Sequence, residues 1–197
     1  NTSTPFPCAA GTYGPSSGQA SAFSCALCTG GRYCPSLGMS APGPLCSSGY
    51  YCPPGQSVNT VNFPCPIGSY CPLGSAYPIR CAPGNYSDLP MLAVCKVCPT
   101  GYFCNPKDLC NATNYTSPKL CAQGHYCPPG TRYPTEFPCP AGTWSGASGL
   151  VQSSDCTPCS PGLYCPTPGM VAEDPVNNKC AGGFFCVGRA VVPAPVD

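Results

Sequence analysis

The sequence predicts a small disulfide-rich repeat protein, an elongated stack of about ten repeats with short β-hairpins and turns and little or no helix. The first reason is composition: 21 Cys, 29 Pro and 23 Gly stand among 197 residues, and cysteine above a tenth of a chain is typical of a disulfide scaffold. The second is a pattern of Cys, two variable residues, Gly, one variable residue and an aromatic, which recurs about every 20 residues. The third is that Pro and Gly interrupt every stretch long enough for a regular helix or a long strand.

This repeat is the element around which the chain is organised. Its ten copies begin at Cys8, Cys28, Cys46, Cys65, Cys81, Cys98, Cys121, Cys139, Cys159 and Cys180. The Gly at the fourth position can take a positive φ, which permits the tight turn that brings two nearby cysteines together. The aromatic at the sixth position supplies apolar surface, and we expect stacked repeats to bury these rings against neighbouring disulfides.

Cysteine spacing favours local disulfides. Seven repeats close with a second Cys directly after the aromatic, which gives the pairs Cys28–Cys34, Cys46–Cys52, Cys65–Cys71, Cys98–Cys104, Cys121–Cys127, Cys159–Cys165 and Cys180–Cys186. The other three repeats have their second Cys at the end of the following spacer, which gives the pairs Cys8–Cys25, Cys81–Cys95 and Cys139–Cys156. In the loop-entropy model each short bridge stabilises the fold by roughly 2–3 kcal/mol.

An interleaved pairing uses the same number of cysteines, with Cys28–Cys46 and Cys34–Cys52 and the same order downstream. It stays open, because connectivity cannot be read from sequence. Local pairing is favoured because the extra repeat at Cys65–Cys71 then inserts without disturbing any partner. Either scheme leaves Cys110 over, which suggests an intermolecular bridge, a free thiol or a partner in a segment outside this chain.

The three displaced cysteines divide the array into super-repeats at 8–80, 81–138 and 139–186. The segments 1–7 and 187–197 lie outside the pattern, contain Pro, and are expected to be extended. The plain interpretation of both is linker; the sharper one is that 190–196 docks as an extended arm against a neighbouring subunit. Because the chain has neither an initiator Met nor a signal peptide, we expect a processed chain or a segment of a longer one.

Composition also indicates the compartment and the partners. Disulfides persist in oxidising surroundings, so we expect an extracellular or cell-surface protein. Four sequons support N-linked glycans, at Asn1, Asn85, Asn111 and Asn114, and the Pro-rich spacers would permit O-linked ones. Eight Lys and Arg against seven Asp and Glu give a net charge of +1, without a basic stripe for nucleic acid or an anionic membrane. No apolar run approaches the roughly 18 residues of a membrane-spanning helix, so we expect no membrane insertion.

Catalytic and cofactor chemistry finds little support. The one histidine, His125, occupies a variable position of its repeat, where an exposed spacer is expected rather than a general base. Zinc is the serious alternative because Cys-x-x-Cys occurs three times, at Cys25–Cys28, Cys95–Cys98 and Cys156–Cys159. Each instance is flanked by cysteines at disulfide spacing, and the calcium and thioredoxin patterns are absent. We therefore expect no enzyme, no metal and no cofactor other than covalent glycans.

The stretch Cys139-Pro-Ala-Gly-Thr-Trp-Ser145, followed by Cys156-Thr-Pro-Cys159-Ser-Pro-Gly-Leu-Tyr-Cys165-Pro, resembles the ephrin-receptor-like cysteine-rich repeats. The resemblance covers essentially residues 8–186. The shorter pattern Cys-x-x-Gly-x-Tyr is also similar to growth-factor-receptor and tumour-necrosis-factor-receptor modules. The resemblance implies an extracellular, disulfide-linked structural or interaction array with no catalytic residues to carry over.

Two functions follow as expectations. The first is a structural glycoprotein that polymerises head-to-tail with copies of itself into an extracellular fibre or coat, since repeat arrays contact mainly their neighbours. The second is a receptor or adhesion ectodomain that binds a protein or glycan ligand, with Tyr50, Tyr77 and Tyr133 expected to be exposed and to serve as contact residues. Specific self-association separates the two, because only the first requires it.

Overall fold

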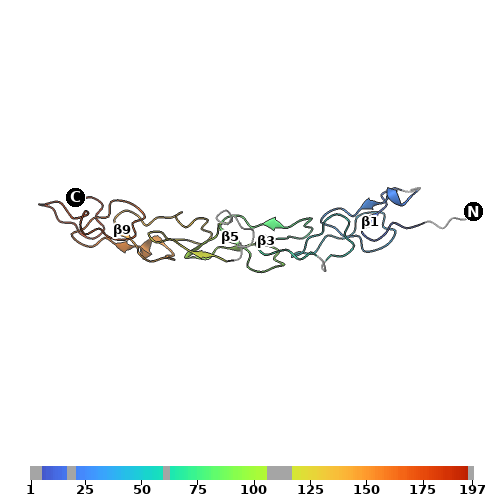
Figure 1. Cartoon of the computed structure of the whole chain (residues 1–197), viewed down its shortest axis with the longest axis horizontal. Helices are drawn as coiled ribbons and strands as arrows, with labels where there is room; N and C mark the ends of the chain where they lie inside the picture. Colours follow the sequence, from blue (N-terminus) through green and yellow to red (C-terminus); the bar gives the residue numbers. More distant parts are fainter. Residues whose placement is uncertain (1–5, 17–20, 60–62, 106–116, 195–197) are drawn as a thin grey trace, which may run out of the picture. The chain divides into compact units, whose positions relative to one another are not determined.

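The chain folds as a small disulfide-rich protein of short β-hairpins, as the composition predicts. The structure is a computed structural model, and it describes residues 6–16, 21–59, 63–105, 117–194. In Figure 1 the strands appear as short arrows joined by long loops, with β1, β3, β5 and β9 labelled. Helix within these ranges is limited to two 3-10 turns, η1 (Ala22–Ser24) and η2 (Ser153–Asp155).

Ten strands of two residues each pair within the described residues as five two-stranded sheets. They are β1 (Thr12–Tyr13) with β2 (Ala26–Leu27), β3 (Ser69–Tyr70) with β4 (Ile79–Arg80), β5 (Asn85–Tyr86) with β6 (Lys96–Val97), β7 (Tyr102–Phe103) with β8 (Lys119–Leu120), and β9 (Thr143–Trp144) with β10 (Thr157–Pro158). The registers are antiparallel, as in the pairing of Thr12 with Leu27 and of Tyr13 with Ala26.

All these hairpins follow one rule. The two residues after the repeat Gly pair with the two residues before the next repeat's first Cys, so a hairpin consists of one repeat and its own spacer. Four further repeats form the same pairing as a single bridge, at Arg32–Leu45, Tyr50–Pro64, His125–Pro138 and Leu163–Lys179. Each pairing is confined between the repeat Gly and the first Cys of the next repeat, and no larger sheet forms among the described residues.

The core consists of disulfides rather than aromatic rings. Cys28, Cys34, Cys46 and most other half-cystines are essentially inaccessible to solvent. The repeat aromatics are half-buried, apart from Phe185, which is 82% exposed. The expectation that stacked repeats bury these rings is therefore met only in part.

Contacts divide the chain into two compact units. Among the described residues the first comprises 6–81 with 87–96, and the second comprises 82–86, 97–105, 117–194. The division into three super-repeats stays a prediction from cysteine spacing.

Candidate functional site

Within the described residues the structure contains ten disulfides, and all of them are local. Seven join cysteines six residues apart, and three close the longer loops, Cys8–Cys25, Cys81–Cys95 and Cys139–Cys156. These are the local pairs that the spacing favours, and the interleaved scheme does not occur. The half-cystines of Cys-x-x-Cys therefore belong to different bridges: Cys25 pairs back to Cys8, and Cys28 pairs forward to Cys34.

Consecutive repeats are joined through the backbone of the repeat glycine, the Gly at the fourth position. At the junction of the second and third repeats, the Gly31 N–H donates to the Cys52 carbonyl and the Gly31 carbonyl accepts from the Cys46 N–H, both at 2.8 Å. The same two bonds recur at the other junctions, for example around Gly101 and Gly142. Both polar groups of a buried backbone position are thereby satisfied by the next repeat.

A second pair of backbone bonds completes this junction. The Gly55 N–H of the third repeat donates to the Cys28 carbonyl of the second, and the Cys34 N–H donates to the Gln56 carbonyl, both at 2.8 Å. Gly55 belongs to a second tight turn in the spacer, which we call the spacer turn. Four backbone bonds thus join consecutive repeats wherever the spacer turn of the later repeat is described, as expected for an array stabilised by nearest neighbours.

Sequence reasoning missed the spacer turn, although a signal exists. The residue at its tip has positive φ in eight repeats of the described chain, at Gly38, Gly55, Gly74, Met91, Gly130, Gly149, Gly169 and Arg189. Three of these glycines end the strings Cys-Pro-Pro-Gly or Cys-Pro-Leu-Gly, at Gly55, Gly74 and Gly130. Met91 and Arg189 are the two described non-glycine residues with positive φ, at 61° and 71°.

Repeat glycines are also needed for a close contact two repeats further on. A β-carbon on Gly11, Gly31 or Gly124 would overlap the spacer-turn carbonyl oxygen of Gly55, Gly74 or Gly169 respectively. The repeat glycines from Gly11 to Gly142 are buried, whereas Gly162 and Gly183 are exposed, with no atom near enough to meet a β-carbon. Each repeat glycine therefore becomes covered only when two further repeats follow it in the stack.

The three repeats with long bridges have a small residue where the others have their closing cysteine. Ser87 and Ser145 occupy that place, with 0% and 4% exposure, and their carbonyls accept from the Gly68 and Gly124 N–H groups at 3.0 and 2.8 Å. The backbone pattern therefore does not require the closing cysteine. It requires only a residue small enough to be buried there.

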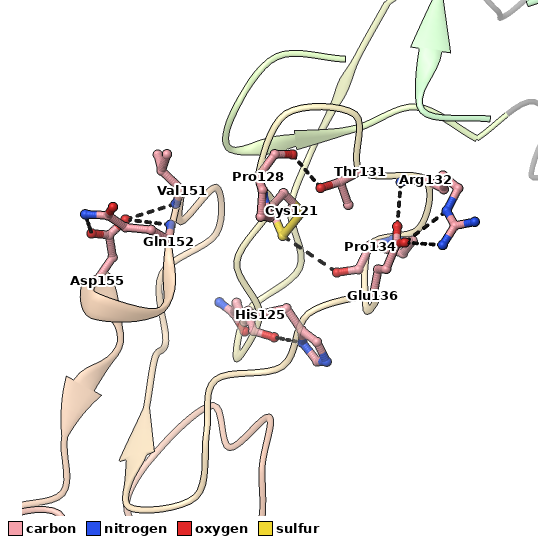
Figure 2. Close-up of a disulfide and its surroundings, with 12 residues drawn as sticks. Cys121, His125, Pro128, Thr131, Arg132, Pro134, Glu136, Val151, Gln152 and Asp155 are labelled. Carbon is pink, nitrogen blue, oxygen red and sulfur yellow. Dashed lines mark hydrogen bonds and ion pairs between the residues drawn. A yellow bond between two sulfur atoms is a disulfide. The ribbon is translucent and has the colours of Figure 1, made fainter. Parts of the chain in front are cut away.

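Figure 2 shows the surroundings of Cys121, whose partner is Cys127. The Thr131 hydroxyl donates to the Pro128 carbonyl at 2.5 Å and closes the spacer turn, with the Thr131 side chain fully buried. Beyond it the Arg132 guanidinium and the Glu136 carboxylate face each other, with two N–H···O bonds at 2.9 and 2.6 Å. These bonds hold the pKa of Glu136 below its ordinary value. The ion pair stabilises the spacer between Cys127 and Cys139.

Other carboxylates likewise stabilise the turns around them. Asp155 accepts from the Val151 and Gln152 N–H groups at the start of η2, at 3.0 and 3.1 Å, which lowers the pKa of Asp155 (Figure 2). Asp174 accepts from the Asn177 N–H, which lowers the pKa of Asp174. The Lys96 ammonium lies 2.7 Å from Asp88 and lowers the pKa of that carboxyl. These groups all stabilise turns, and none lies in a constellation suited to acid–base work.

The remaining predicted residues are placed as follows. His125 is half-buried rather than exposed as expected, because its ring lies beside the spacer-turn Gly169; its Nδ1 lies 2.9 Å from the Gln123 carbonyl oxygen (Figure 2). Asn85 is half-buried in β5, next to the buried Ser87 of its own sequon. Asn1, Cys110, Asn111 and Asn114 lie outside the described residues.

Of the tyrosines proposed as ligand contacts, Tyr77 and Tyr133 are exposed, at 60% and 41%. Tyr50 is half-buried, and its hydroxyl lies 3.0 Å from the Met91 sulfur, at the spacer turn two repeats further on. The expectation that Tyr50 is exposed was wrong, because the spacer turn at Met91 lies against its side chain.

No family model matches this chain. A protein from Arabidopsis thaliana, white-brown complex homolog protein 30, is 30% identical to it over 107 residues. The match covers 48% of this chain and 9% of the plant protein, so the chain is similar to a small part of a much longer relative.

Ten disulfides within the described residues make this a protein of the secreted or extracellular type. None of the helical segments that the structure describes has the length and apolar character needed to cross a membrane. In the same ranges, no three His, Cys, Asp or Glu side chains come together in a way that could hold a metal ion.

Proposed function

We propose that this chain is a structural extracellular glycoprotein, the subunit of a fibre or coat that assembles from copies of itself. The observation that carries the proposal is the junction between repeats. The two backbone bonds of the repeat glycine form at one junction after another, from Gly11 to Gly162, and the second pair accompanies them wherever the spacer turn of the later repeat is described. A surface that binds its own kind repeatedly within a chain is suited to do the same between chains.

Surface chemistry supports this proposal. Charged residues make up 8% of the chain, while apolar side chains such as Val176, Phe185 and Phe6 are 77%, 82% and 93% exposed. Few charges and many exposed apolar groups favour association over dispersion. Cystines in place of a large apolar core keep each repeat folded while its surface remains available to others.

Negative-stain electron microscopy of the native, unreduced protein tests the proposal. Uniform filaments or sheets with a regular axial repeat are the expected result. Dispersed single particles at micromolar concentration would contradict it. The glycan part has its own test, since treatment with a peptide N-glycosidase should lower the apparent mass and convert each occupied sequon asparagine to aspartate.

A receptor or adhesion ectodomain is the second candidate, and the exposure of Tyr77 and Tyr133 favours it. It predicts dispersed monomers that bind a protein or glycan, with affinity lost when Tyr77 or Tyr133 is replaced by Ser. The same micrographs therefore separate the two functions before any ligand is known.

A further inference from the structure

The half-cystines of the described residues differ in their exposure to solvent. Most of them are buried, but Cys25, Cys95 and Cys180 are only half-buried. The loop that ends at Cys25 includes residues outside the described ranges, and Cys180 belongs to the last repeat of the sequence. Cys95 is therefore the clearest case, because its loop is described throughout and a repeat lies on either side of it in the sequence.

Cys95 is bonded to Cys81, and the two halves of this bridge are covered unequally. Cys81 is 3% exposed, whereas Cys95 is half-buried. The equivalent long bridge of the eighth repeat joins Cys139 to Cys156, which are 0% and 2% exposed. The chain thus contains two long bridges in equivalent places, of which one is accessible from solvent at one half-cystine and the other is enclosed.

The loop closed by the accessible bridge is attached to the preceding repeat by four backbone hydrogen bonds. Two are those of the repeat glycine Gly68, which donates to the Ser87 carbonyl at 3.0 Å and accepts from the Cys81 N–H at 3.1 Å. The other two are made by the spacer turn, through the Met91 N–H and the Leu92 carbonyl, both at 2.9 Å. No sulfur atom takes part in these four bonds, so the loop can stay attached when the bridge is open.

An ion pair also joins the two sides of this loop without help from the bridge. Asp88 directly follows the buried Ser87, Lys96 directly follows Cys95, and the Lys96 ammonium lies 2.7 Å from the Asp88 carboxylate. These residues and Cys81 all belong to the first compact unit. The ion pair therefore keeps Cys95 beside its own loop whether or not the sulfur–sulfur bond is intact.

The six-residue bridge of the preceding repeat differs in both respects. Cys65 and Cys71 are 0% exposed, and the backbone of each is hydrogen-bonded to neighbouring repeats. An external thiol reaches such a bridge only after repeats separate, which breaks several hydrogen bonds at once. Because the rate of thiol–disulfide exchange depends on access to the sulfur, the Cys81–Cys95 bridge should react before enclosed bridges of this kind.

We infer that Cys95 is a modification site, at which the folded protein takes up a small external thiol as a mixed disulfide. The thiolate attacks the Cys95 sulfur, the bond between Cys81 and Cys95 breaks, and its electron pair leaves with the Cys81 sulfur, which takes up a proton. One disulfide bond replaces another, so the step needs no oxidant. The inference goes beyond the proposed function and does not depend on it, because it concerns a single chain.

Reduced glutathione is the probe, added to the native protein after any free thiol has been blocked with N-ethylmaleimide. After a short exposure the reaction is quenched with excess iodoacetamide in denaturant, and unreduced tryptic peptides are examined by mass spectrometry. Trypsin releases residues 81–96 as a peptide whose only cysteines are Cys81 and Cys95. We expect glutathione on Cys95 and the alkyl group on Cys81, at least about tenfold faster than any labelling of the matched control bridge Cys139–Cys156.

Hydrogen exchange shows whether the stack persists in the labelled protein. The Gly68 amide donates to the Ser87 carbonyl, so it should stay as protected after glutathione uptake as before. Loss of this protection would mean that uptake requires unfolding, which overturns the inference. Glutathione on Cys81 instead of Cys95, equally fast labelling of Cys139–Cys156, or no uptake at Cys95 would each overturn it as well. Fast uptake at Cys95 with Gly68 still protected supports it.

Discussion

The carbonyl oxygen of Gly74 lies where a β-carbon of Gly31 would stand. Gly31 is in the second repeat and Gly74 in the fourth, so this contact limits how closely alternate repeats approach. The same relationship joins Gly11 to Gly55 and Gly84 to Gly130. At these positions the repeat glycine is therefore required for two reasons, a positive φ and the absence of a side chain.

Gly31→Ala should therefore destabilise the protein strongly. The substitution combines a strained φ of 81° with overlap of a backbone oxygen, and we expect the free energy of unfolding to fall by about 3 kcal/mol. Gly183→Ala is the matched control: its φ is 88°, nothing lies near its β-carbon, and the cost should be about 1 kcal/mol. Denaturant unfolding in dilute solution with the disulfides intact measures both. Equal losses in the free energy of unfolding would mean that overlap with the Gly74 carbonyl oxygen has no effect.

Arg189→Gly should stabilise the protein. Arg189 has a φ of 71° at a spacer turn where most repeats have glycine, so the substitution relieves a strained backbone and should add about 1 kcal/mol. The reverse change, Gly169→Arg, occupies the same place one repeat earlier and should cost a similar amount. Thermal unfolding of the two variants checks the prediction, and a destabilised Arg189→Gly would contradict it.

Local disulfide pairing predicts which peptide trypsin releases from the unreduced protein. Trypsin cleaves after Lys119 and Arg132, so the peptide 120–132 contains Cys121 and Cys127 and no other cysteine. Because these two are bonded to each other, the peptide should be released free, with an internal disulfide visible in its mass. Thiol blocking before denaturation prevents exchange. A peptide that remains linked to Cys98 or Cys104 until reduction would establish the interleaved scheme instead.

The Arg132–Glu136 pair should contribute stability only above acid pH. The pKa of Glu136 is lowered in the folded chain, chiefly by its hydrogen bonds to Arg132. Its contribution is therefore complete above the unfolded value of about 4.3, and is lost as pH falls through the lower folded value. Glu136→Gln should lower the thermal midpoint by about 2–4 °C at most near neutral pH. The difference from wild type should vanish in acid; a difference that grows as pH falls would contradict this account.

Much of this architecture could be predicted from the sequence. Ten copies of Cys-x-x-Gly-x-aromatic give the repeat, and the six-residue spacing gives bridges such as Cys121–Cys127. Prediction is possible here because the bridge and the turn at the repeat glycine are local, so their geometry depends on residues within a few positions of each other.

The contacts between repeats could be found only from the tertiary structure. The spacer turn, the cover over Gly31 and the partial burial of Tyr50 depend on residues about 40 positions apart, where spacers of unequal length conceal the register. The contact between Phe63 and Tyr51 likewise became recognisable once a hairpin brought the end of a spacer back to its own repeat. The physical reason is the distance along the chain between the residues that interact. A disulfide loop is specified by the spacing of two nearby cysteines, whereas backbone hydrogen bonds between loops form only when the loops are stacked.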